Sequence, residues 1–187
     1  MSDPYGKSAF APFAVRSYRF QWPADLCTSF AFEMETIILS WYVLVETQSV
    51  FMLSVYVSMQ HLGTLLGPIL GVVGDRVGQR NMLTGMRGLY ACTSGTLLAC
   101  VFAGALTPTI VLVLAFIVGM VRPSDIGMRN AVISEIMPPP LLMSAAGIQR
   151  TTQDSARIFG AITGAGLVTV LGMSYAYIAI CALYVCS

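Results

Sequence analysis

The sequence predicts an all-α membrane protein, and three observations support this prediction. Hydrophobic residues make up 56% of the 187 residues and charged residues only 10%, whereas a soluble domain carries about 25% charged residues. The apolar residues form long blocks instead of short alternating runs, which favours helices in lipid. The basic residues fall on alternate connections between these blocks. Together these features argue against a water-soluble fold.

The apolar blocks divide the chain into a lead-in and a helical bundle. A spanning helix needs about 20 mostly apolar residues. Residues 1–24 lack such a run and are predicted to be a cytoplasmic lead-in, and residues 25–187 form the bundle. The predicted spans are about 26–45, 50–73, 82–106, 109–134, 142–171 and 175–187. The sixth is too short to cross a bilayer, so we expect it to be a truncated helix.

Short polar, glycine or proline segments separate the spans in order. Residues 46–49 turn the chain after the first span, and a charged loop beginning at Gly74 follows the second. Pro108 suits the first turn of the fourth helix, where its missing N–H has no cost. Three consecutive prolines from Pro138 must end that helix. Gly172 opens the last turn, before the sixth stretch.

The arginines predict the orientation in the membrane. Basic residues precede the first span, lie between the second and third, and flank the connection between the fourth and fifth, whereas the other turns have none. These residues are Lys7, Arg16, Arg19, Arg76, Arg80, Arg129 and Arg150. Since basic residues favour the cytoplasmic side, we expect a multi-pass protein of the plasma membrane (a bacterial inner membrane) with a cytoplasmic N-terminus.

Several classes of function find no support in the sequence. The chain has no basic run of the kind that binds nucleic acid. Its five cysteines and single histidine show no metal-binding spacing. No nucleophile or acid–base motif indicates an enzyme. We therefore expect no metal and no cofactor.

The sharpest motif lies between the second and third spans. It has the form G-x-x-x-D-R-x-G-x-R and is made of Gly71, Asp75, Arg76, Gly78 and Arg80, with a further glycine at Gly74. The glycines permit a sharp turn and close helix contact, and Asp75 can accept charge-assisted hydrogen bonds. Two interpretations stay open: a conformational latch, or charges that only set the topology.

At this position the motif resembles the signature loop of the major facilitator superfamily. The layout of the spans is similar to the N-terminal half of its drug and siderophore (enterobactin) exporters. The resemblance implies a six-helix half-transporter in which this loop steadies one access state through contacts with a second half. It also implies alternating access of two halves around a central site. A missing six-helix half, or a second chain, is then the expected partner, and the isolated chain is expected not to transport.

Charged residues inside the predicted spans are the candidates for a cavity or a coupling site, because such residues are costly in lipid. Glu33 and Glu35 lie about 200° apart around the first helix, so they cannot both face one cavity squarely. One can bind a proton or cation while the other pairs with an arginine. A purely structural pairing of both is the alternative.

Two other ionisable residues lie within the predicted spans. His61 is either a packed hydrogen-bonding residue or a proton relay. Arg87 is expected to extend to the cytoplasmic interface.

Two further sets of charges repeat an arginine–aspartate–arginine pattern on one helix face. The fourth span carries Arg122, Asp125 and Arg129, and the fifth carries Arg150, Asp154 and Arg157. Spacings of three and four residues permit ion pairs along a helix. Matched faces on two helices suggest one cavity on the cytoplasmic side, although a structural network is an equal alternative. Arg122 also resembles the superfamily's arginine of the fourth helix.

Two stripes of small residues predict close helix packing. Gly63 and Gly67 lie in the second span and Gly160 and Gly164 in the fifth, each pair four residues apart. The superfamily's antiport motif has a proline after the glycine in the fifth helix, where this chain has Ala161.

The sequence therefore predicts a secondary transporter, an exporter of small molecules, present as a half-length chain. The alternative is a membrane scaffold or an inactive, truncated gene product that does not transport. The substrate, the direction and the coupling ion do not follow from the residues.

Overall fold

A computed structural model of the chain describes residues 11–65, 74, 76 and 78–187. Within them the chain forms long helices and no strands. The α-helices are α1 (Arg16–Thr47), α2 (Val50–Met59), α4 (Gln79–Phe102), α5 (Pro108–Ile136), α6 (Leu142–Leu171) and α7 (Met173–Cys186). Short 3-10 turns occupy Ala11–Ala14, Leu62–Leu65 and Pro139–Leu141. The predicted all-α fold is confirmed.

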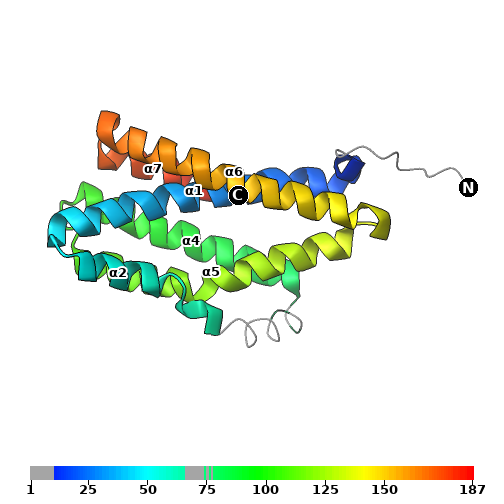
Figure 1. Ribbon diagram of the computed structural model, residues 1–187, viewed down its shortest axis with the longest axis horizontal. Coiled ribbons are helices and arrows are strands. Elements are labelled where there is room, and N and C mark those ends of the chain that lie inside the picture. The colour runs from blue at the N-terminus through cyan, green and yellow to red at the C-terminus, as the bar shows by residue number, and fades with distance from the viewer. Residues whose placement is uncertain (1–10, 66–73, 75, 77) are drawn as a thin grey trace, which may run out of the picture.

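The helices form an up-and-down bundle (Figure 1). The α1–α2, α4–α5 and α6–α7 connections lie at one end, and the starts of α1 and α4 lie at the other with the α5–α6 connection. Helix α1 packs against α6 and α7, and α4 packs against α5 and α7. The main core lies between them, with Met34, Tyr90 and Tyr177 almost fully buried.

Three helical segments of the described chain have the length and apolar composition to cross a membrane: Arg16–Thr47, Pro108–Ile136 and Pro139–Leu171. Val50–Leu65 and Met173–Cys186 are shorter apolar segments. The outward faces of these helices are apolar, with Phe51, Phe159 and Val170 among their exposed side chains. A surface of this kind suits acyl chains and not water. The bundle is that of a membrane-embedded protein.

Helix α1 begins earlier than the span predicted from hydropathy. It starts at Arg16 and continues through Pro23, so residues 16–24 of the predicted lead-in are the first turns of the same helix. A rise of about 1.5 Å per residue gives a 32-residue helix a length of about 48 Å, more than the roughly 30 Å of a bilayer core. Hydropathy detects only the part of a helix that is apolar enough for lipid, and Gln21 and Asp25 lie outside that part.

Two segments approach a neighbouring helix closely at glycines: α6 approaches α1, and the turn after α2 approaches α5. In α6, a Cβ atom added at Gly160 would lie 3.1 Å from the Cβ of Glu33, and one added at Gly164 would lie 3.0 Å from the Cα of Met34. Gly63 and Gly119 form the second approach, between the turn after α2 and α5, where an added Cβ would overlap the opposite backbone. Gly67 lies outside the described residues.

A hydrogen bond closes the end of the bundle where α1 meets the α4–α5 connection. The hydroxyl of Tyr42 donates to the carbonyl oxygen of Leu106 over 2.8 Å. We expect Tyr42→Phe to lower the free energy of unfolding by about 1 kcal/mol, because the carbonyl loses a partner and little else changes. Unfolding by sodium dodecyl sulfate in mixed micelles measures this loss. Tyr175→Phe, at an exposed tyrosine, is the control, and an equal change in both variants would contradict the prediction.

Candidate functional site

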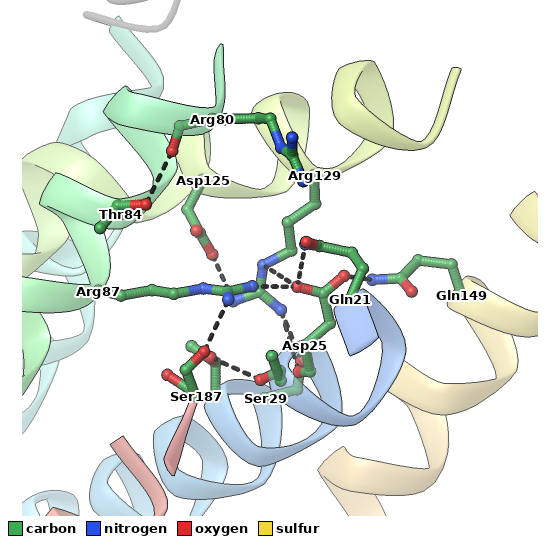
Figure 2. A network of polar contacts seen from close by, with 12 residues as sticks. Gln21, Asp25, Ser29, Arg80, Thr84, Arg87, Asp125, Arg129, Gln149 and Ser187 are labelled. Carbon is green, nitrogen blue, oxygen red and sulfur yellow. Dashed lines mark hydrogen bonds and ion pairs between the residues drawn. The ribbon is translucent and has the colours of Figure 1, made fainter. Parts of the chain in front are cut away.

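Four charged side chains from three helices meet in the interior of the bundle. Asp25 comes from α1, Arg87 from α4, and Asp125 and Arg129 from α5. Arg87 forms an ion pair with Asp25, and Arg129 pairs with Asp125 over 2.6 Å. A longer contact of 3.8 Å joins Arg129 to Asp25. We call these four residues the buried charge cluster; Figure 2 shows them converging between the helices.

Uncharged polar groups complete the surroundings of Asp25. The side-chain amides of Gln21 and Gln149 donate to its carboxylate over 3.0 Å and 3.4 Å. Arg129 donates to the backbone carbonyl of Asp25 and to the hydroxyl of Ser29. Gln149 belongs to α6, so the network joins α1, α4, α5 and α6 (Figure 2). A buried charge is tolerated only when it is paired and hydrogen-bonded, and this network meets that condition for Asp25.

A second charged group lies beside the cluster, nearer the surface. Glu33 of α1 is 3.6 Å from Arg122 of α5 and 3.8 Å from Arg157 of α6. We call Glu33, Arg122 and Arg157 the arginine–glutamate triad. Arg122 also donates to the side-chain oxygen of Gln60 over 2.8 Å. Its guanidinium lies 3.3 Å from the ring centre of Phe32, within the range of a cation–π interaction.

A cavity of about 70 Å³ connects the two groups. Charged residues of both line it, together with polar and aromatic side chains from α1, α4 and α6. The lining residues are Thr28, Ser29, Phe32, Glu33, Tyr90, Arg122, Asp125, Ile126, Arg129, Gln153 and Arg157. The structure thus brings together five of the candidate residues predicted from the sequence.

Glu35 faces away from this cavity. Its carboxylate is buried and accepts a hydrogen bond from the hydroxyl of Tyr184 over 2.9 Å. It lines a separate and smaller cavity with Tyr56 and Gln60. The angular separation of Glu33 and Glu35 along α1 therefore places them in different environments.

Three other candidates lie outside the cavity of the triad. Arg150 and Asp154 pair with each other over 3.2 Å on the surface of α6, with side chains 73% and 50% exposed. Of the α6 set only Arg157 lines this cavity. The exposed His61 has its Nδ1 3.0 Å from the carbonyl oxygen of Val57, one turn earlier.

The glycine–arginine loop is described in part. Gly74 is buried against the side chain of Met128, and Arg76 and Arg80 are exposed. Gly78 has a φ of 92°, a conformation that strains any residue with a Cβ atom. Gly71 and Asp75 lie outside the described residues.

Sequence reasoning missed Asp25 and misplaced Arg87. Asp25 fell at the boundary of the predicted lead-in, and Arg87 was expected at the cytoplasmic interface, whereas it turns inward to Asp25. An acid at the edge of one apolar block and an arginine inside another were the available signals. Their partnership is invisible in the sequence, because 62 positions separate them.

An apolar helical bundle with charged side chains paired in its interior defines a polytopic membrane protein with a polar region inside its bundle. Comparison with known families adds the particular group: residues 7–187 match the family described as transmembrane secretion effector, and the chain belongs to this family of the major facilitator superfamily transporters. No curated protein and no solved structure matches the chain.

Proposed function

We propose that the chain acts in the export of small molecules by alternating access, with the triad and its cavity as part of the substrate path. The family is one of transmembrane transporters and secretion effectors, which supports transport in general. The alternation of basic connections supports a plasma membrane location with the N-terminus and the Arg76–Arg80 loop in the cytoplasm. The proposal involves no covalent chemistry.

The observation that carries the proposal is the position of Glu33. Its carboxylate lies between two arginines on different helices, at distances too long for strong hydrogen bonds. A charge network that served only to hold helices together would be tightly paired, as Arg87 of α4 and Asp25 of α1 are. Loose pairs beside a cavity can exchange partners when a substrate or a proton arrives.

The buried charge cluster and the triad suit different roles in the transport cycle. The buried charge cluster joins α1, α4, α5 and α6 and would let them move as one body. The triad lies at the edge of that body, where Arg157 is exposed. Transport by alternating access also needs a second bundle to complete the site. We infer that a second six-helix half, in the same polypeptide or in another, provides it and contacts the loop of Arg76 and Arg80.

Changes at the triad test the proposal. Everted membrane vesicles containing the protein, expressed from its complete reading frame, are expected to accumulate at least one of a panel of anionic, neutral and cationic fluorescent dyes. Glu33→Gln and Arg122→Lys are expected to lower the initial rate by at least about tenfold, because the first removes the carboxylate between the two arginines and the second removes the planar guanidinium; a loss of about 1.4 kcal/mol in the transition state is a tenfold change in rate. Liposomes that contain residues 1–187 alone are expected to show no flux.

Arg150→Gln is the matched control, because Arg150 is an arginine of α6 outside the cavity. It should transport at the unchanged rate. Equal amounts of each variant in the membrane and equal unfolding midpoints separate loss of transport from loss of folding. Accumulation no greater than in vesicles without the protein, for every dye, would favour the scaffold alternative and contradict the proposal.

A further inference from the structure

The charges in and beside the cavity divide into two groups that differ in net charge, and Glu35 lies apart from both in a cavity of its own. The buried charge cluster contains two aspartates and two arginines, so its formal charge is zero. The triad contains one glutamate and two arginines, so its formal charge is +1. Arginine does not lose its proton in proteins. The excess positive charge of the site is therefore located at Arg122 and Arg157.

The two arginines of the triad are not saturated by Glu33. Their distances to its carboxylate, 3.6 Å and 3.8 Å, exceed the roughly 2.7–2.9 Å of a charge-assisted hydrogen bond. Arg122 is held independently by Gln60 and by the ring of Phe32, so its position does not depend on Glu33. Arg157 extends from the surface of α6 with its side chain 67% exposed, so a molecule arriving from outside the bundle can reach it.

The cavity offers the right surroundings for an anionic head group. Its volume of about 70 Å³ has room for a small group and not for a whole drug-sized molecule. Polar side chains of Thr28, Ser29 and Gln153 lie on its wall together with the aromatic rings of Phe32 and Tyr90. A planar carboxylate fits the fork of a guanidinium, and an aromatic or apolar remainder of the same molecule can lie against the rings.

We propose that the triad is an anion subsite and that the exported molecules carry a carboxylate, which binds between Arg122 and Arg157 in place of Glu33. This inference rests on the proposed transport function and adds the chemical class of the substrate. Glu33 is then a built-in competitor, whose carboxylate lies between the two arginines while the site is empty. The arrangement predicts opposite effects on anion binding from substitutions only a few ångströms apart.

Binding of radiolabelled benzoate to the purified chain in a non-ionic detergent tests this inference. Benzylamine and benzyl alcohol have the same ring with a positive or an uncharged group, and a chloride-free buffer at pH 7 removes the main competing anion. We expect saturable binding of benzoate that the other two compounds do not displace. Arg157→Gln should weaken it about tenfold, the effect of losing one charge-assisted contact. Glu33→Gln should strengthen it about three- to tenfold.

Arg150→Gln is the control and should bind benzoate like the unmodified chain. The inference is overturned if benzoate shows no saturable binding, if benzylamine or benzyl alcohol displaces it equally well, or if Glu33→Gln weakens binding. These outcomes leave the transport proposal standing, because the vesicle assay measures flux of the dyes without regard to their charge. Conversely, stronger benzoate binding by Glu33→Gln supports the subsite even when the vesicles show no flux.

Discussion

Replacing Asp25 with asparagine is expected to lower the free energy of unfolding by about 3–5 kcal/mol, the cost of removing one partner from a buried ion pair. Asp25 is 1% exposed and contacts both arginines of the buried charge cluster. Asparagine keeps the shape but removes the charge, which leaves Asp125 as the one carboxylate for two guanidiniums. Unfolding by sodium dodecyl sulfate in mixed micelles, followed by circular dichroism, measures the change.

The control for this variant is Asp154→Asn. Asp154 forms a comparable pair with Arg150, four residues away, but on the surface, where an ion pair contributes about 0–1 kcal/mol. A loss for Asp25→Asn no larger than that for Asp154→Asn would show that the buried charge cluster does not hold the helices together.

A double variant measures the interaction energy between Asp25 and Arg87. Asp25→Asn with Arg87→Gln restores a neutral cluster of one carboxylate and one guanidinium. We expect it to be less destabilised than the sum of the single variants, with a coupling energy of about 1–3 kcal/mol. Additive losses would indicate that Arg87 and Asp25 act independently.

Replacing Gly119 with alanine is expected to destabilise the bundle by about 1–3 kcal/mol, the usual cost of overpacking. The added methyl group would overlap the backbone carbonyl of Met59 and lie 2.8 Å from the Cα of Gln60. Backbone atoms cannot move aside as a flexible side chain can, so the turn after α2 must shift away from α5. Because Gln60 accepts a hydrogen bond from Arg122, the shift should also disturb the triad.

Gly127 provides a matched control in the same helix. A Cβ atom added there meets no heavy atom within 4 Å. Both substitutions gain the higher helix propensity of alanine, about 1 kcal/mol over glycine, so their difference reports the packing alone. We expect Gly127→Ala to be neutral or stabilising. Equal unfolding midpoints for the two variants would contradict the close approach of α5 and the turn after α2.

The buried charge cluster and the triad are expected to contribute differently to stability and to function. The buried charge cluster is neutral and mostly tightly paired, whereas the triad is positively charged, loosely paired and partly exposed. Substitutions in the cluster should therefore act mainly on folding. Substitutions of Glu33 and Arg157 should act mainly on binding and transport, because the fold depends less on them.

The sequence predicted the helices better than it predicted their charged contacts. Composition and block length indicated the membrane fold, and the connections near Glu46, Pro108 and Gly172 lie where the structure ends or begins its helices. The spacing of Glu33 and Glu35 indicated different faces of α1. The beginning of α1 was not predictable from hydropathy, since its first turns are too polar to score as a span.

By itself the sequence determined that this protein folds in a lipid environment, because long apolar blocks with few charges can bury their surface only among lipids and one another. It also determined which residues are costly there, because an ionisable group in an apolar block is recognisable without a structure. Only the tertiary structure decided how these residues pair. Asp25 meets Arg87, and Glu33 lies between Arg122 and Arg157, because helices distant in sequence pack side by side, and no local pattern records which helices these are.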